Sequence, residues 1–310
     1  MIFITAGKQS EEGRGMPAKA NQQDTRAAVV AITLSVAALS LGDAVIKATG
    51  LSLPLWQMFI ARSSLVVPVL WWLIRRRGSV TVSRPIWPLL RSVLLVAMWL
   101  SYYASLPLMP LSLAAAAYYT GPLFIVAIAA MVGRRWPSGR AMIAVACGFV
   151  GVWLIVRPDT AGFSPEALLP VVAAVLYASA MVLTSAKCQS DDPLVLALVL
   201  HGVFIISGAL LGLFAGHDGS LILGPWQPLD MRLMATILAL AGLILVGSVG
   251  AAIAYQKGPP ATVAAFDYSY LAFSLNWGGL FFGEVPGLMA LVGISLIVVA
   301  GLLALQRTPG

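Results

Sequence analysis

Three ionisable side chains lie inside long apolar stretches of this chain: Asp43, Arg62 and Asp267. A charged residue at the centre of a membrane helix costs roughly 2.5–3.5 kcal/mol on insertion scales, so such residues pair with one another or mark a functional path. A carboxylate can bind an ammonium group or carry a proton, and an arginine fork binds a carboxylate through two hydrogen bonds. The three side chains therefore indicate recognition of a small charged molecule, or proton transfer, inside a membrane.

Each of these residues also has a structural alternative. Lys47 follows Asp43 by one helical turn, so the two can neutralise each other on one helix face. Arg62 has no carboxylate close to it in the sequence, so it either pairs with Asp43 or Asp267 across helices or binds the carboxylate of a cargo. Asp267 either binds cargo or a proton or belongs to a structural hydrogen-bond network.

Aromatic side chains supply the rest of a candidate binding surface. Ring faces attract ammonium groups, and phenol hydroxyls bind polar atoms. Core packing, or a place in the aromatic belt at the membrane interface, is the alternative for each ring. The predicted substrate-binding residues are Asp43, Arg62, Trp99, Tyr102, Tyr118, Tyr177, Asp267, Tyr268 and Tyr270.

Residues for catalysis or metal binding are not assembled in this sequence. His201 and His217 are the two histidines, and neither belongs to a Ser-His-Asp or paired histidine-acid set, so His201 is interpreted as a packing residue. Cys147 and Cys188 are interpreted as small hydrophobic residues. A GxxxxGK[ST] run for ATP is absent. We predict no enzyme activity, metal or cofactor; a membrane-embedded enzyme is the non-transport alternative.

The composition is that of a polytopic membrane protein. Hydrophobic residues make up 60% of the chain and charged residues 10%, with a mean hydropathy of +0.92. A helix needs about 20 apolar residues to cross a bilayer, and the unbroken apolar runs exclude a barrel of alternating polarity. Ten segments qualify as spans: 27–47, 54–74, 85–106, 110–132, 139–157, 164–188, 192–216, 231–256, 259–283 and 286–306.

The chain contains an internal repeat with five spans in each copy, and an odd number of spans inverts the second copy in the membrane. We therefore predict an all-α membrane protein in which residues 27–157 and 160–306 form two inverted repeats around a central cavity. The copies match at a constant offset of 150 residues, which pairs Pro110, Ser112, Ala114, Ala115, Tyr118, Gly133, Gly151 and Arg157 with Pro260, Thr262, Ala264, Ala265, Tyr268, Gly283, Gly301 and Arg307.

Prolines interrupt the helices at related places in the two copies. Pro107 and Pro110 lie between the third and fourth spans, and Pro259 and Pro260 lie between the eighth and ninth. Proline removes helical hydrogen bonds and fixes the local turn. The four prolines are predicted hinges of a moving carrier, with tight turns between adjacent helices as the alternative.

The motifs of the two copies resemble a known family. Gly-Pro-Leu-Phe at 121–124, Ala-Ala-Phe-Asp-Tyr at 264–268 and Phe-Gly-Glu-Val-Pro at 282–286 are similar to EamA domains of the drug/metabolite transporter superfamily, and the likeness covers 27–306. In layout the chain is most similar to the YddG-type amino-acid exporters. The resemblance implies alternating access and export of amino acids, with aromatic or apolar side chains preferred. Other small metabolites, cationic drugs, nucleosides and vitamins are alternative cargoes.

The basic residues indicate the orientation. With the amino terminus in the cytoplasm, 15 of the 19 Lys and Arg residues lie inside, so the positive-inside rule places both termini in the cytoplasm. The family resemblance implies the inner membrane of a bacterium. The net charge of +7 then reflects topology and not nucleic-acid binding. Residues 1–26 are polar and are predicted to be a disordered cytoplasmic tail. The expected partners are a small-molecule substrate and the lipid bilayer, with the protein a monomer.

Overall fold

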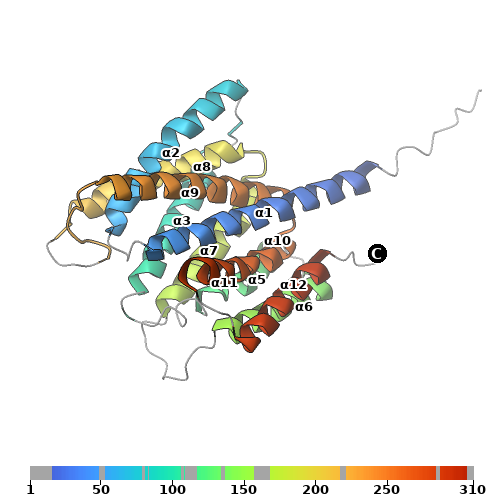
Figure 1. The fold of residues 1–310 in the computed structure, drawn as a ribbon. Helices are drawn as coiled ribbons and strands as arrows, with labels where there is room; N and C mark the ends of the chain where they lie inside the picture. The colour runs from blue at the N-terminus through green and yellow to red at the C-terminus, as the bar shows by residue number, and fades with distance from the viewer. Residues whose placement is uncertain are drawn as a thin grey trace, which may run out of the picture.

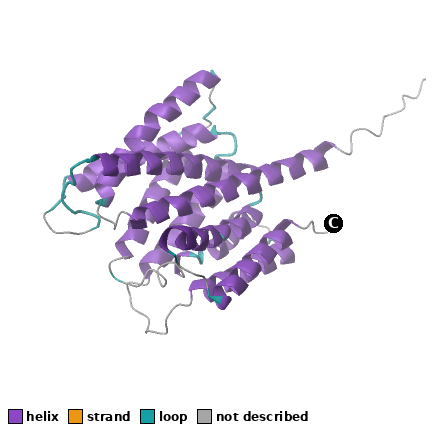
Figure 2. Ribbon diagram, in the orientation of Figure 1, coloured by secondary structure: helices purple, strands orange, loops and turns teal. Residues whose placement is uncertain are grey.

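The computed structural model is helical, and the part of the chain that it describes contains no strand (Figures 1 and 2). The described residues are 16–48, 53–78, 81–82, 84–105, 108, 117–133, 137–156, 168–216, 221–283 and 287–305. In chain order the helices are α1 (Met16–Ala48), α2 (Leu55–Arg77), α3 (Ile86–Ser105), α5 (Gly121–Gly133), α6 (Gly139–Val156), α7 (Leu168–Lys187), α8 (Pro193–Gly212), α9 (Met231–Lys257), α10 (Pro260–Asp267), α11 (Ser269–Phe282) and α12 (Leu288–Leu305).

Within the described residues, six helices are long and apolar enough to cross a membrane: α1 over Asp24–Ile46, α2, α3, α7, α8 and α9. Shorter apolar helical stretches occupy Gly121–Gly133, Gly139–Leu154 and Leu291–Ala300. Long apolar helices in this number make the chain a multi-pass membrane protein.

Two predicted boundaries differ from the structure. α1 begins at Met16, so residues 16–26 of the predicted disordered tail are helical; about half of this stretch is Ala, Gln, Lys and Arg, which are good helix formers. The predicted span 259–283 is two helices, because α10 ends at Asp267 and α11 begins at Ser269. The Ser269 hydroxyl donates to the Phe266 carbonyl over 2.6 Å, a local bond that competes with helical pairing.

Helices that are far apart in the sequence pack side by side (Figure 1). α1 lies along α9, α2 along α8, and α3 along α7. α6 and α12 form a separate pair at one edge of the bundle. α1 also contacts α11, and α5 contacts α7. The interior is therefore bounded by helices from both halves of the chain.

The helix ends gather on two opposite faces of the bundle. We call the face where α1 ends and α2 begins the α1/α2 end, and the face where α2 ends and α3 begins the α2/α3 end. At the α2/α3 end, the Thr81 hydroxyl donates to the Ser190 carbonyl over 2.9 Å, and the Asp192 N–H donates to the Thr81 carbonyl over 3.0 Å. Asp192 also caps α8 and lies 3.6 Å from the Arg77 guanidinium.

Close backbone contact fixes α8 against α2. A Cβ added to Gly208 of α8 would lie 2.8 Å from the Trp56 carbonyl oxygen of α2, a backbone atom that cannot move aside without moving its helix. A Cβ added to Gly202 of the same helix meets nothing within 4 Å. In a membrane, small residues of this kind allow helices to approach where lipid gives no hydrophobic driving force.

We predict that Gly208→Ala destabilises the protein while Gly202→Ala does not. Overpacking against the Trp56 carbonyl should cost about 1–3 kcal/mol, whereas alanine in place of an unhindered helical glycine should stabilise by up to about 1 kcal/mol. Thermal unfolding of the purified variants in detergent measures both effects. Equal midpoints for the two variants would show that the α2–α8 contact is not as close as described.

Candidate functional site

Asp43 of α1 and Arg62 of α2 line one small cavity in the half of the bundle nearer the α1/α2 end. Trp99 and Tyr103 of α3 form its aromatic wall, and apolar side chains of α9 lie opposite. The cavity has room for a water molecule but not for a metabolite. A half-buried carboxylate and a buried guanidinium thus line one small cavity.

Arg62 presents an unused edge of its guanidinium. The residue is 4% exposed, and its Nε and Nη2 have no hydrogen-bond partner in the described part of the chain. These two nitrogens are the edge that binds a carboxylate with two parallel hydrogen bonds. The ring of Phe204, 5.2 Å from the guanidinium carbon, stabilises the cation from its face. Arg62 is therefore held in place by packing and not by a bond that uses this edge.

Asp43 is held from the second half of the chain. The Tyr270 hydroxyl of α11 donates to the Asp43 carboxylate, and one turn earlier on α1 the Ser40 hydroxyl accepts a bond from the Trp277 indole over 3.1 Å. α11 is thereby joined to α1 by two polar contacts. The orientation of the carboxylate depends on the position of α11.

Asp267 has a hydrogen-bond network of its own, in the half of the bundle nearer the α2/α3 end. Its Oδ2 accepts bonds from the hydroxyls of Tyr177 on α7, over 2.7 Å, and Tyr255 on α9, over 3.2 Å. Asp267 is the last residue of α10, directly before the break at Tyr268. The two sides of this break therefore hold different neighbours, because Asp267 bonds α7 and α9 while Tyr270 bonds α1.

Tyrosine rings occupy the space between the two carboxylates. Tyr118 lies at their centre, with ring centroids 5.1 Å from Tyr102, 5.8 Å from Tyr119 and 6.1 Å from Tyr177. Tyr119 in turn lies 5.6 Å from Tyr270. The chain of rings runs from the tyrosine that holds Asp43 to the tyrosine that holds Asp267. Such a surface binds apolar or aromatic groups by stacking and ammonium groups by their charge.

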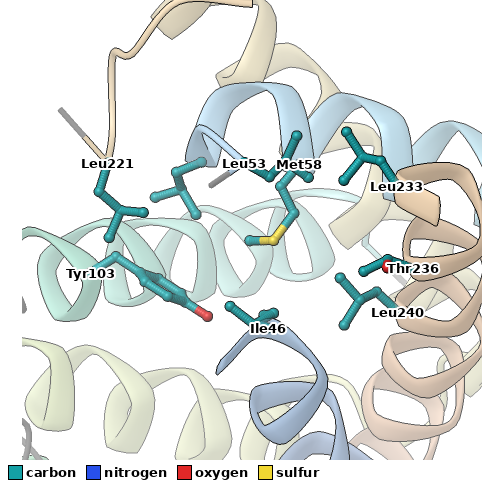
Figure 3. A pocket seen from close by; sticks show the side chains of 9 residues that line it. Ile46, Leu53, Met58, Tyr103, Leu221, Leu233, Thr236 and Leu240 are labelled. Atoms are coloured by element: carbon teal, nitrogen blue, oxygen red, sulfur yellow. The ribbon is translucent and has the colours of Figure 1, made fainter. Parts of the chain in front are cut away.

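A second, apolar cavity lies beside the first at the α1/α2 end (Figure 3). The two cavities share Ile46, Tyr103 and Leu240 as lining residues. Leu53 and Leu221 come to the apolar cavity from outside the helices, and Figure 3 shows their side chains on its far side from Ile46. The apolar cavity therefore lies between the Asp43 cavity and this end of the bundle.

Gln57 binds segment 221–227, whose Leu221 lines the apolar cavity. Its side-chain amide donates to the Gln227 carbonyl over 2.7 Å and accepts from the Gln227 N–H over 2.8 Å. The Leu55 N–H donates to the Leu221 carbonyl over 2.8 Å, and the Trp56 indole donates to the Gly224 carbonyl over 2.9 Å. The start of α2 thus holds segment 221–227 almost entirely through its backbone.

The structure brings together most of the predicted site residues but places Tyr268 elsewhere. Asp43, Arg62 and Trp99 meet at one cavity, and Tyr102, Tyr118, Tyr177, Asp267 and Tyr270 form the adjoining network. Tyr268 is fully buried against α6, where a Cβ on Gly148 would lie 2.2 Å from its ring. Tyr268 directly follows Asp267, and because successive side chains on a helical backbone point about 100° apart, the two residues contact different neighbours.

Of the four predicted hinge prolines, two lie at the start of α10 and two lie outside the described residues. Pro259 is the N-cap of α10 and Pro260 its first residue, positions where proline fits a helix start without breaking it; this placement agrees with the turn alternative. Pro107 and Pro110 lie outside the described residues. The break within the helix itself comes later, at Tyr268.

Several polar residues at buried positions were not among the predicted sites. Gln57 and Arg91 are almost fully buried, and Tyr255 is a direct partner of Asp267. Arg91 is one of the 15 basic residues predicted at the cytoplasmic side, because it lies close in sequence to the charged stretch that ends α2. Its place inside an otherwise apolar helix, α3, is the signal that identifies it as buried.

The chain is similar to curated bacterial transporters. It is 26% identical to the pseudopaline exporter of Pseudomonas aeruginosa over 91% of this chain and 97% of the relative. It is 29% identical to a riboflavin transporter of Rhizobium johnstonii over 71% of this chain and 70% of the relative. It is 22% identical to an S-adenosylmethionine uptake transporter of Rickettsia felis over 87% and 89%. The chain is a homologue of bacterial membrane transporters.

A solved structure has the same fold. This crystal structure superposes with a TM-score of 0.74 at 18% sequence identity and covers 91% of this chain and 98% of its own. No family model matches the chain, so the likeness to EamA domains and to YddG-type exporters remains a resemblance. The relatives are transporters of small molecules and not named as enzymes.

We predict that Gln57→Leu destabilises the protein whereas Gln227→Ala has little effect. Leucine at 57 leaves the backbone N–H and carbonyl of residue 227 without their partner, at a cost of about 1–3 kcal/mol. Alanine at 227 keeps both backbone groups, so the Gln57 bonds survive. Thermal unfolding in detergent compares the variants, and an equal loss in both would mean that the Gln227 side chain, not its backbone, carries the contact.

Proposed function

We propose that this protein exports amino acids, or compounds with an amino-acid head group, with apolar or aromatic side chains preferred. The observation that carries the proposal is the unused Nε and Nη2 edge of Arg62 in the same small cavity as Asp43. A zwitterion supplies the complement of such a site, because its carboxylate fits the guanidinium fork and its ammonium group fits the carboxylate. Neither charge of the cavity then remains without a partner.

The rest of the cargo would lie against the aromatic residues. Trp99 forms a wall of the Asp43 cavity, and the rings of Tyr102 and Tyr118 adjoin it. The names of the relatives give the alternatives: S-adenosylmethionine is itself an amino-acid derivative, and riboflavin is a flat aromatic compound that suits a tyrosine surface. Nucleosides and cationic drugs are the further alternatives from the EamA resemblance.

We propose the architecture as two inverted repeats of five spans, with α10 and α11 together forming the ninth. The packing supports this, because exchanging the two halves converts one set of contacts into another: α1 with α9 becomes α7 with α3, and α1 with α11 becomes α7 with α5. The pairs α2 with α8 and α6 with α12 convert into themselves. Alternating access would then exchange the two arrangements around the central tyrosines, in a monomer.

We place the α2/α3 end in the cytoplasm of a bacterium, with the protein in the inner membrane. Most of the described basic residues lie at this end, as the positive-inside rule requires; Lys47 and Arg232 lie at the other end. Those at the α2/α3 end are Lys19, Arg26, Arg75, Arg76, Arg77, Arg84, Arg140, Lys187 and Lys257. The α1/α2 end then faces outward, and export proceeds from the α2/α3 end toward it.

The proposal predicts exchange of labelled phenylalanine in liposomes that contain the purified protein and are preloaded with unlabelled phenylalanine. Arg62→Gln should raise the half-saturating concentration roughly tenfold or more, since it removes the charge of the fork, and Arg62→Lys should restore only part of the loss. Asp43→Asn should act similarly through the ammonium group. Exchange of riboflavin or S-adenosylmethionine, but not of phenylalanine or other amino acids, would replace the proposed cargo.

Asp267→Asn tests whether this carboxylate takes part in proton coupling. Asparagine retains the shape and can still accept from Tyr177 and Tyr255, so we expect normal folding but a loss of transport or of its pH dependence between about pH 5.5 and about pH 8. A purely structural Asp267 would instead lower the unfolding temperature and leave transport per folded molecule unchanged, with the same pH profile as the wild type.

The orientation predicts that cysteines at Val82 and Leu229 react from opposite sides of the membrane. Both side chains are 41% exposed, and they lie at the α2/α3 and α1/α2 ends respectively. In a background without Cys147 and Cys188, a membrane-impermeant maleimide added to intact cells should label Leu229→Cys and leave Val82→Cys unlabelled. Labelling of Val82→Cys alone would reverse the orientation.

A further inference from the structure

Arg91 is a second buried arginine, separate from both cavities. It lies on α3, close to the α2/α3 end, and is 1% exposed. Its Nε donates to the Thr184 hydroxyl of α7 over 2.7 Å, while its Nη1 has no hydrogen-bond partner in the described part of the chain. A guanidinium with a free N–H inside a membrane bundle is costly unless an anion reaches it at some point in the functional cycle.

The helix face that holds Arg91 also leads to Asp267. Thr184 follows Tyr177 by seven residues on α7, so the two side chains lie on one face of that helix about 10 Å apart along its axis. Tyr177 donates to Asp267, and Thr184 accepts from Arg91. A carboxylate and a buried guanidinium therefore border the same face of α7, about two turns apart.

At the α2/α3 end, beyond Arg91, hydrogen bonds join α9 to the segment that follows α7; we call these bonds the cover. The Gln256 side chain of α9 donates to the backbone carbonyls of Cys188 and Asp191. Cys188 follows Thr184 by one turn, so this cover begins directly beyond the Arg91 contact. A carrier that opens toward the cytoplasm has to release this connection. When it does, Arg91 and then Asp267 are the first buried charges that an entering molecule meets.

We propose that Arg91 and Asp267 form a second binding station of two successive contacts: Arg91 first binds the carboxylate of the zwitterion, and Asp267, about two turns further along α7, then receives its ammonium group on the way to the Arg62–Asp43 cavity. This inference rests on the proposed function. The cargo enters from the cytoplasm, binds Arg91 through the free N–H, and passes along the tyrosine rings to Arg62. Arg91 governs binding from the cytoplasmic face and Arg62 governs binding from the outer face.

The experiment measures phenylalanine exchange separately from each face of the membrane. Everted membrane vesicles expose the cytoplasmic face and right-side-out vesicles the outer face, both preloaded with unlabelled phenylalanine. Arg91→Gln should raise the half-saturating concentration roughly tenfold in everted vesicles and leave the value in right-side-out vesicles within about twofold of the wild type. Arg62→Gln should raise the value in right-side-out vesicles by roughly tenfold or more.

Two further variants separate binding from packing. Thr184→Val removes the hydroxyl that holds Arg91 but retains the charge, so it should affect the cytoplasmic face in the same direction and more weakly. Arg91→Lys retains the charge without the planar fork; if Arg91→Gln does not fold, Arg91→Lys decides the question by the same comparison of the two faces.

The outcomes distinguish this inference from the proposed function. If the wild type exchanges phenylalanine and the Arg91 variants change both faces equally, or neither face, the second station is wrong and Arg91 only packs α3 against α7. If the wild type exchanges no amino acid from either face, the proposed function itself fails. A loss confined to everted vesicles establishes the station.

Discussion

The cost of a charge in a low-dielectric interior governs the arrangement of this protein. Asp43, Arg62, Arg91 and Asp267 each lie on a largely apolar helix, so most of their stabilisation has to come from other helices. Tyrosine hydroxyls supply it for the carboxylates, and packing and a threonine hydroxyl supply part of it for the arginines. Every one of these contacts joins segments distant in sequence, and together they determine which helices face the interior.

The carboxylates and the arginines differ in how fully their polar atoms are hydrogen-bonded. Asp267 accepts two phenol hydrogen bonds, and Asp43 accepts one. Both arginines, by contrast, retain nitrogens without partners among the residues that the structure describes. Neutral phenols satisfy an anion without cancelling its charge, so the carboxylates remain able to attract a cation. The arginines are only partly satisfied, Arg91 by the Thr184 hydroxyl and Arg62 by the Phe204 ring, so each keeps N–H groups that can bind an external anion.

The sequence was sufficient for the helices and for the buried charges, and insufficient for their partners. The length of the apolar runs predicts α2, α7 and α8, because a helix needs about 20 apolar residues to cross a membrane. It cannot predict that Tyr270 reaches Asp43, since the two are 227 residues apart and nothing in either local pattern refers to the other. Arg91 was assigned to the membrane surface because it is close in sequence to the loop before α3. Closeness to a loop in sequence is a poor measure of depth here, because α3 already begins at Ile86. Tyr268 was placed with Asp267 and Tyr270 because it lies between them in sequence, whereas its side chain packs against α6.

The pair of α6 and α12 stands apart from the bundle and meets it mainly through α5, α10 and α11. These helices carry large apolar side chains on their outer surface, among them Trp153, Val150, Leu291 and Leu302. A shift of α10 and α11 at the break during the proposed alternating access would therefore also move α6 and α12, whose apolar outer surface faces lipid. The work of deforming the surrounding lipid then becomes part of the free energy of each turnover, and membrane thickness and lateral pressure become terms in the speed of the carrier.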